Sequence, residues 1–539
     1  MELNLRVCAA FLFLLAVNVH CDDRRPLVTI KDGLIRGTYQ QSYEGRTYVA
    51  FEGIPYAQPP VQNLRFEDPE PVKPWTGILQ ATSTYSCMQI IRGEPTGQED
   101  CLYLNVYVPR DKFDPSQNLD VIVHIHGGAF MLGNPAFMAA PGLIMDRDVV
   151  YVTMNYRLGV FGFYSTGNGI SNGNFGLKDQ AFALKWIQDN IHHFGGNKDS
   201  VTITGLSAGG TSVHLHYFST LSEGLFHKGF AQSGAALVSW AIRKTPEVKS
   251  KILAEAVGCP WGDLECLKQR SAVQIIGTLN DGNGLGIHFG PTIEPASPNS
   301  FLSKMPYSKL KAKEVLDVPL LFSVVTEEGT VPCGVLYGQF DHLDQNWNHI
   351  MPSMLDYYNE EKQDEISKEI RDFYLQKEPV TVENFGKVIK MCSDRVFHNG
   401  VEKSAKLQAP LTESDVYVMV IGYLGRGEAL AMFGVKADVG VGHGTDGRFY
   451  YQNFPMGPSD LDEEEIKMKN ILLDTLVSFA KTGTPDVKGV HFEPVLKSGD
   501  FKYLLVNSPD NITMRRVETL GEVEFWDSLG LKEDENLVA

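Results

Sequence analysis

Short apolar runs alternate with segments of helical periodicity over most of the chain. Six of these runs are rich in Val, Ile and Tyr, and several are apolar on both faces, as in buried strands. They span residues 102–108, 121–126, 149–154, 201–204, 318–325 and 416–421. Between the third and the fourth, residues 177–191 carry apolar side chains at helical spacing. This alternation predicts an α/β fold with a mostly parallel central sheet and helices on both faces.

The composition suits one large acidic domain. The chain has 539 residues, 43% of them apolar, and neither a Pro/Gly/Ser-rich linker nor an internal repeat divides it. Although the length alone would suggest three or four domains of about 150 residues, we expect a single domain over residues 22–539. Acidic residues outnumber basic residues by 66 to 48, a net charge of −18. This charge disfavours nucleic acid and anionic membrane surfaces as partners.

Residues 1–21 have the pattern of a secretory signal peptide. Residues 7–19 are almost uninterruptedly apolar, and Val19 and Cys21 are small enough for the two cleavage-site positions. No later stretch approaches the roughly 18 apolar residues that a membrane helix needs, and the C-terminus carries no lipid-anchor motif. We therefore expect a secreted, extracellular protein with no membrane anchor and one N-glycan at the sequon of Asn511.

Eight cysteines are present, and two of them fall in the expected signal segment. Four others form two pairs that are close in sequence, Cys87 with Cys101 and Cys259 with Cys266. In an oxidising compartment, such short loops are plausible disulfides. Cys333 and Cys392 have no obvious partners, so a third bridge and two buried thiols both stay open.

A nucleophile elbow is predicted around Ser207. The strand at 201–204 runs into Gly205-Leu206-Ser207-Ala208-Gly209-Gly210, and residues 211–219 can form a helix. This is a G-x-S-x-G motif in the strand-turn-helix context that it requires, where small neighbours allow a sharp turn that exposes the hydroxyl. The motif alone is weak in a chain with 51 glycines, but its context makes Ser207 a candidate nucleophile.

An oxyanion-hole loop is expected where the strand at 121–126 ends. The segment Gly127-Gly128-Ala129-Phe130 follows and matches the HGGG-type loop, with alanine in the last position. The backbone amides of Gly128, Ala129 and Ala208 could then bind the oxygen of a tetrahedral intermediate. Taken alone, a plain glycine-rich turn explains this loop equally well.

Candidates for the acid and the base follow the serine in the order that the α/β-hydrolase fold uses. The run at 318–325 ends at Thr326-Glu327-Glu328-Gly329, which places carboxylates at the end of a strand. Further along, Gly442-His443-Gly444 sets a histidine in a glycine-rich loop. Neither segment is persuasive by itself, because a histidine in a polar loop is more often solvated than catalytic.

Two pairs of histidines raise the alternative of a metal site. His124 and His126 lie two residues apart on a strand, and so on one face. We disfavour a zinc site there because no third ligand stands at a metal-binding spacing and no H-E-x-x-H motif occurs. His214 and His216 point in divergent directions on the helix after Ser207. We therefore expect no metal and no cofactor.

Several motifs, in order along the chain, together resemble the type-B carboxylesterase family. They are Glu99–Val106, the His126–Gly128 loop, Asn155–Gly159, Asn174–Gln180 and Gly205–Gly210. The family includes the cholinesterases and the secreted insect esterases, and the insect branch is the nearest in its oxyanion loop. The likeness runs from about Val28 to about Val506. It implies an α/β-hydrolase fold and hydrolysis of a small-molecule ester without a cofactor.

The resemblance also implies roles for individual residues. The catalytic triad would be Ser207, Glu328 and His443, with Glu327 an ordinary surface acid. The oxyanion donors would be the amides of Gly128, Ala129 and Ala208, and Ser233 would support the acid from behind it. The implied ion pairs are Arg65 with Glu99 and Arg157 with Asp179, and the implied disulfides are Cys87–Cys101 and Cys259–Cys266.

Two departures from the family pattern bear on the substrate. Leu206 stands before the serine, where the family often has glutamate, and no Trp lies between Cys87 and Cys101. Both changes weaken the binding of a cation such as choline, so we expect neutral, mainly apolar esters. A specialised juvenile hormone esterase and a lipase are the enzymatic alternatives. A non-catalytic binding or adhesion member is disfavoured, since such relatives usually lack the serine. The oligomeric state stays open.

Overall fold

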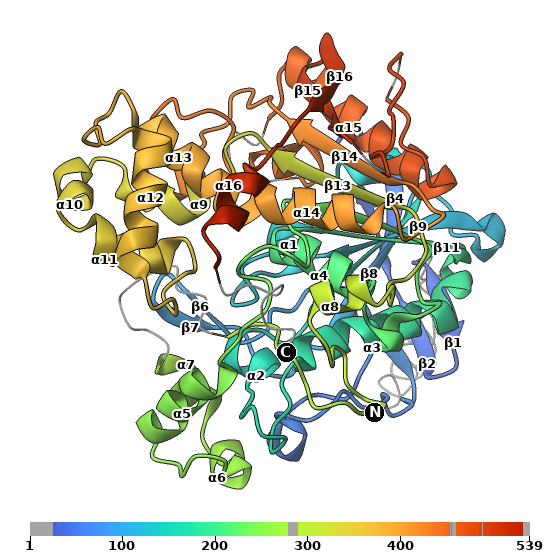
Figure 1. The fold of residues 1–539 in the computed structure, drawn as a ribbon. Coiled ribbons are helices and arrows are strands. Elements are labelled where there is room, and N and C mark those ends of the chain that lie inside the picture. Colours follow the sequence, from blue (N-terminus) through green and yellow to red (C-terminus); the bar gives the residue numbers. More distant parts are fainter. Residues whose placement is uncertain are drawn as a thin grey trace, which may run out of the picture.

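Six strands of the main sheet coincide with the six apolar runs of the sequence, and its other five strands were not among the predicted runs. The computed structural model describes residues 25–278, 289–452, 454, 460–487, 489–497 and 499–531, so the expected signal peptide lies outside the described residues. Within these residues the main sheet has eleven strands (Figure 1). From edge to edge they are β16 (Asn511–Val517), β15 (Phe501–Ser508), β14 (Val416–Ile421), β13 (Leu320–Val325), β12 (Lys228–Gln232), β11 (Gly196–Leu206), β9 (Leu119–Ile125), β10 (Val150–Met154), β8 (Tyr103–Val108), β4 (Thr47–Pro55) and β3 (Thr38–Gln41).

The central part of this sheet is parallel and its edges are antiparallel. Every neighbouring pair from β10 through β15 runs parallel. The pairs β10–β8, β8–β4, β4–β3 and β15–β16 run antiparallel. Parallel neighbours need long crossover connections, and helices supply most of them. The predicted α/β fold with a mostly parallel sheet is confirmed.

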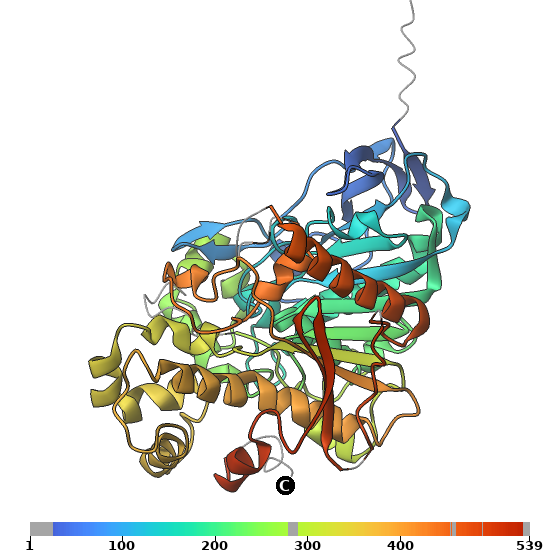
Figure 2. The same cartoon turned by 90° about the horizontal axis from the view of Figure 1, so that it is seen from above.

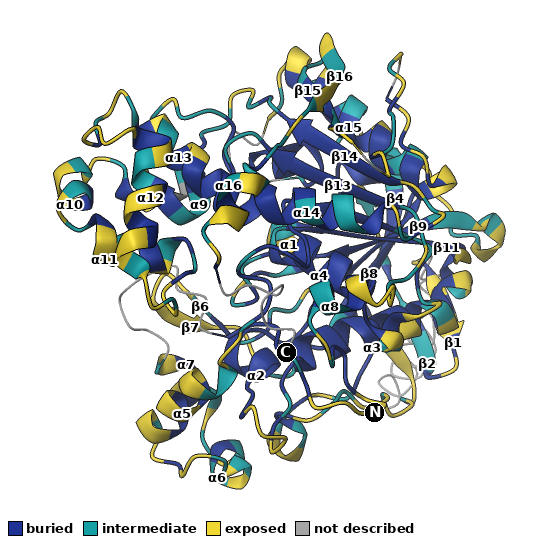
Figure 3. Ribbon diagram, in the orientation of Figure 1, coloured by how far each residue is buried: buried dark blue, intermediate teal, exposed yellow. Residues whose placement is uncertain are grey.

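Two hydrophobic cores lie on the two faces of the sheet. On β9, Val121 and Val123 belong to one core and Ile122 to the other, since side chains alternate along a strand. The first core includes side chains of α3 (Phe175–Asn190), α4 (Ala208–His216) and α14 (Asn399–Gln408). The second is covered by α15 (Glu463–Thr482). Figure 2 shows α14 and α15 on opposite sides of the sheet, and Figure 3 shows the central strands buried along their length.

Three disulfides join described cysteines. Two are the pairs that the resemblance implies, Cys87–Cys101 and Cys259–Cys266. The third, Cys333–Cys392, decides the open alternative in favour of a bridge. Among the described helices, none is long and apolar enough to cross a bilayer.

Candidate active site

Ser207 occupies a strained turn between β11 and α4. Its backbone has φ 62° and ψ −121°, a region that residues other than glycine rarely adopt and that often marks a functional site. The flanking glycines are needed for space. A Cβ at Gly205 would lie 2.4 Å from the backbone of Gly209, and one at Gly209 would lie 2.1 Å from the carbonyl oxygen of Ile125. The local sequence therefore folds into the predicted elbow at the carboxyl end of β11.

Glu328 and His443 form a buried hydrogen-bonded pair. Glu328 follows β13 and is fully buried, and its Oε2 lies 2.5 Å from Nδ1 of His443. The other oxygen, Oε1, accepts hydrogen bonds from the Ser233 hydroxyl at 2.6 Å and from the Val325 amide at 2.9 Å. A carboxylate held in this way orients an imidazole, so that its second nitrogen is free to act as a base.

Glu327 is not an ordinary surface acid, and that expectation was wrong. Its carboxylate accepts a hydrogen bond from the amide of Val441 at 2.6 Å and one from the hydroxyl of Thr326. Its own amide donates to the carbonyl of Val441 at 3.0 Å, and Thr330 accepts from the amide of His443 at 2.8 Å. The turn after β13 is thus joined directly to the loop that carries the histidine. Sequence could not reveal this, because the two segments are more than a hundred residues apart.

The expected oxyanion loop packs against the elbow. Gly128, Ala129 and Phe130 all have positive φ, at 108°, 56° and 62°. A Cβ at Gly127 would lie 2.5 Å from the carbonyl oxygen of Leu206 and 3.2 Å from Cβ of Ser207. The Ala208 amide belongs to the first turn of α4, where backbone amides lack intrahelical acceptors. The loop therefore lies against the serine, and the amides of Gly128, Ala129 and Ala208 belong to these two adjoining segments.

A chain of aromatic rings extends from His443. The rings of Phe130 and Trp240 have centroids 6.4 Å apart, those of Trp240 and Phe397 5.8 Å, and those of Phe397 and His443 4.7 Å. Leu206 is buried beside the histidine loop, since a Cβ at Gly444 would lie 3.9 Å from it. The sequence did not single out Trp240 or Phe397 as site residues, because no motif or spacing marks them.

A second buried carboxylic acid lies near the pair. Asp446 is three residues after His443 and is 1% exposed. Burial and the nearby charge of Glu328 raise the pKa of Asp446 to about 7, and His443 opposes this shift.

The four histidines that raised the question of a metal are separate core residues. His124 bonds Thr204 and Tyr451, and His126 bonds the carbonyl of Gly127. His214 forms a hydrogen bond with Gln408, and His216 forms one with Gln180. No group of three potential ligands gathers in the part of the chain that the structure describes.

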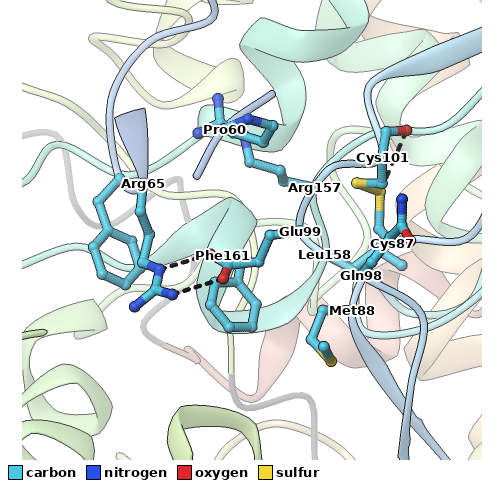
Figure 4. A pocket seen from close by; sticks show the side chains of 11 residues that line it. Pro60, Arg65, Cys87, Met88, Gln98, Glu99, Cys101, Arg157, Leu158 and Phe161 are labelled. Atoms are coloured by element: carbon cyan, nitrogen blue, oxygen red, sulfur yellow. Dashed lines mark hydrogen bonds and ion pairs between the residues drawn. A yellow bond between two sulfur atoms is a disulfide. The ribbon is translucent and has the colours of Figure 1, made fainter. Parts of the chain in front are cut away.

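A small cavity elsewhere has no catalytic groups. It is lined in part by Arg65, Glu99, Arg157 and the Cys87–Cys101 bridge (Figure 4). Arg65 donates to both oxygens of Glu99 at 2.6 Å, and Arg157 pairs with Asp179 at 2.7 Å. These are the two ion pairs that the resemblance implies. Because both guanidinium groups are already paired and no triad candidate lines it, the cavity belongs to the framework of the protein.

Comparison with known proteins finds full-length relatives. The model of the carboxylesterase family matches residues 24–526. Esterase E4 of Myzus persicae is 38% identical and the match covers 93% of this chain and 94% of the relative. For a carboxylic ester hydrolase of Bombus ignitus these values are 36%, 95% and 96%, and for the juvenile hormone esterase of Tribolium castaneum 34%, 86% and 84%. A crystal structure of juvenile hormone esterase from Manduca sexta, with OTFP covalently attached, has the same fold, with a TM-score of 0.80 at 24% identity over 94% of this chain and 99% of that one.

Proposed function

Because the chain belongs to the carboxylesterase family and is a carboxylic ester hydrolase, we propose that Ser207, His443 and Glu328 are its catalytic triad. The observation that carries this proposal is the buried Glu328–His443 hydrogen bond, which occurs in the same molecule as a strained serine elbow. Both lie at the carboxyl ends of parallel strands, where open α/β sheets place their ligand sites.

The chemistry proceeds in two halves. His443 takes the proton of the Ser207 hydroxyl as the oxygen attacks the ester carbonyl, and the resulting imidazolium is stabilised by Glu328. The amides of Gly128, Ala129 and Ala208 bind the oxyanion of the tetrahedral intermediate. The imidazolium then protonates the leaving alcohol, and an acyl-enzyme remains. Water, deprotonated by His443, attacks the acyl group and releases the acid and the free serine.

The substrate is proposed to be a neutral and mainly apolar ester. Leu206 and the rings of Trp240, Phe397 and Phe130 supply apolar surface near the reacting groups. Secretion is part of the proposal, since three disulfides fit an oxidising compartment. One relative is named a venom carboxylesterase, from Apis mellifera. Asn511 is the proposed glycosylation site and lies exposed at the start of β16.

The triad is tested by covalent labelling and by one substitution. An organophosphate should label Ser207 in the purified protein. Ser207→Ala should lower kcat on a short-chain nitrophenyl ester by roughly six orders of magnitude, because only binding and oxyanion stabilisation remain. Ser219→Ala is a matched control, as a serine after the same helix, and should retain full activity. Labelling at another serine, or an active Ser207→Ala variant, would contradict the proposal.

A further inference from the structure

A long helix with a π-helical turn packs behind the acid of the triad. It consists of α13 (Phe385–Ser393), the π-helix η7 (Asp394–His398) and α14, and its backbone stays helical through both junctions. Turns of this type are rare and occur often at functional sites.

Two side chains of this helix bond the turn that carries Glu328. The Ser393 hydroxyl accepts from the amide of Gly329 at 2.8 Å, and Nε2 of His398 lies 2.8 Å from the carbonyl oxygen of Val325. These side chains are five residues apart. In an α-helix, with 3.6 residues per turn, such residues lie on different faces, whereas a π-turn pairs residue i with i+5 and brings them together. The π-turn therefore lets both side chains reach the same turn.

The turn and the helix are also in direct contact. A Cβ at Gly329 would lie 2.1 Å from the carbonyl oxygen of Ile389 and 2.6 Å from the amide nitrogen of Ser393. The Cys333–Cys392 disulfide joins the segment just after the turn to the same stretch of helix. The acid turn thus rests on a surface that offers little freedom to move.

The contact from His398 leads through one residue to the triad. Val325 accepts from His398 through its carbonyl, and its amide donates to Oε1 of Glu328 at 2.9 Å. Because a carbonyl oxygen only accepts, Nε2 of His398 must carry a proton. Displacement of Val325 would therefore move a donor that holds the Glu328 carboxylate opposite His443.

Asp394 holds the other nitrogen of His398. Its Oδ1 lies 3.5 Å from Nδ1 of the imidazole, and its Oδ2 accepts from Lys390 at 2.6 Å and from Tyr374 at 3.0 Å. Burial alone would lower the pKa of His398, but Asp394, Glu328 and the Val325 carbonyl together raise it above its ordinary value. Nε2 therefore faces the Val325 carbonyl and Nδ1 faces Asp394.

We propose that His398 is a positioning residue for the catalytic acid, and that it acts by fixing Val325 and thereby the orientation of Glu328. It does not touch the substrate or the reacting atoms. The inference rests on the proposed triad. It adds a residue that lies 45 positions from His443 in sequence and farther from Glu328 and Ser207. Only the hydrogen bond from Nε2 to Val325 carries this role.

Two amide substitutions separate the two ring nitrogens of His398. In His398→Gln the side-chain amide reaches about as far as Nε2, so it can still donate to Val325. In His398→Asn the amide stands near the place of Nδ1, so it can still bond Asp394 but not Val325. Both variants are neutral, polar and similar in size. His216→Asn is the control, since His216 is a fully buried histidine bonded to Ser222 and Gln180 at the far end of α4.

The expected result is a difference between the two amides in kcat. His398→Asn should lower kcat by about tenfold or more with KM within about twofold, because a small displacement of the acid affects the transition state more than binding. The rate of Ser207 labelling by an organophosphate should fall by the same factor. His398→Gln should retain kcat within about threefold, and His216→Asn should leave kcat unchanged even if it lowers stability.

Equal kcat values for the Asn and Gln variants would overturn the proposal, whether both are active or both are impaired. So would an equal loss in His216→Asn. If His398→Asn does not fold, His398→Met replaces it, since it is similar in size but has no donor for Val325. It should lower kcat while KM is retained, and unchanged kcat there overturns the proposal as well. Wild-type protein and Ser207→Ala are measured in the same assay, so that a failure of the triad itself is recognised separately.

Discussion

Leu206 bears most directly on the proposal of a neutral substrate. It is buried immediately before the nucleophile, and a Cβ at Gly444 would lie 3.9 Å from both Leu206 and Phe454. A glutamate at this position would place a negative charge beside the leaving group. Leucine instead adds apolar surface and leaves a quaternary ammonium without an ionic partner at this place.

A pair of isosteric esters tests this consequence. We expect 3,3-dimethylbutyl acetate to have a higher kcat/KM than acetylcholine, because a desolvated cation site is worth up to about 2 kcal/mol and Leu206 does not contribute one. Leu206→Glu should shift the ratio of the two kcat/KM values toward acetylcholine, whereas the neutral control Leu206→Gln should not. A wild-type enzyme that hydrolyses acetylcholine ten times faster than the neutral ester would show that other residues bind the cation.

At the scale of elements, the site depends on how two loops are joined. Glu328 comes from the turn after β13 and His443 from a loop that precedes α15, and neither is rigid through its own sequence. Glu327 connects them through the Val441 amide, and a Cβ at Gly440 would collide with its carboxylate at 2.2 Å. The two adjacent glutamates therefore make different contacts: Glu328 bonds the imidazole of His443, and Glu327 bonds the loop that carries this histidine.

Removal of this contact should impair both activity and stability. Glu327→Ala should lower kcat by about tenfold and the free energy of unfolding by about 1.5 to 3 kcal/mol, the usual worth of a hydrogen bond to a charged group. Glu327→Gln keeps an acceptor oxygen and should lie between this variant and the wild type. Glu369→Ala, an exposed glutamate of α12 (Gln363–Leu375), serves as the control. Kinetics and urea unfolding of Glu327→Ala that match those of the control would refute the role of Glu327.

At the scale of the whole molecule, buried neutral histidines make the fold sensitive to acid. Burial lowers the pKa values of His124, His126, His214 and His216 to about 3, 4, 4 and 3. In the unfolded chain a histidine titrates near 6.5. Below that pH the unfolded state therefore binds protons that the folded state does not. Asp446 acts in the opposite direction, because its raised pKa makes the folded state bind one proton more between about pH 4 and 7.

We therefore expect unfolding near pH 5 to take up about three protons from these groups, which corresponds to about 4 kcal/mol per pH unit. The stability is fully present above about pH 6.5 and is lost as the pH falls toward 4. Urea unfolding at a series of pH values measures the slope. His216→Gln should reduce the uptake by about one proton, whereas exposed His192→Gln should leave it unchanged. A free energy of unfolding that stays constant from pH 6.5 to 4.5 would contradict this expectation.

The sequence by itself determined the features that depend on short-range geometry. Six strands of the main sheet follow from apolar runs of the right length, and the turn at Ser207 follows from glycines that the local backbone needs. The fold class could be predicted from these patterns, and the family from the resemblance of several motifs in order along the chain. The acid and the histidine could be named only through the resemblance, because no local signal distinguishes Glu328 from Glu327.

Only the tertiary structure decided what surrounds these residues. Glu327 forms a hydrogen bond with Val441, His398 forms one with Val325, and Cys333 forms a disulfide with Cys392. These contacts arise because distant segments converge at the end of β13. The four histidines are buried core residues for the same reason, since burial and hydrogen-bond partners depend on packing between elements. Such contacts leave no periodicity or spacing in the chain. They arise when the sheet brings the ends of its parallel strands to one edge, and this is where the reactive groups are held in place.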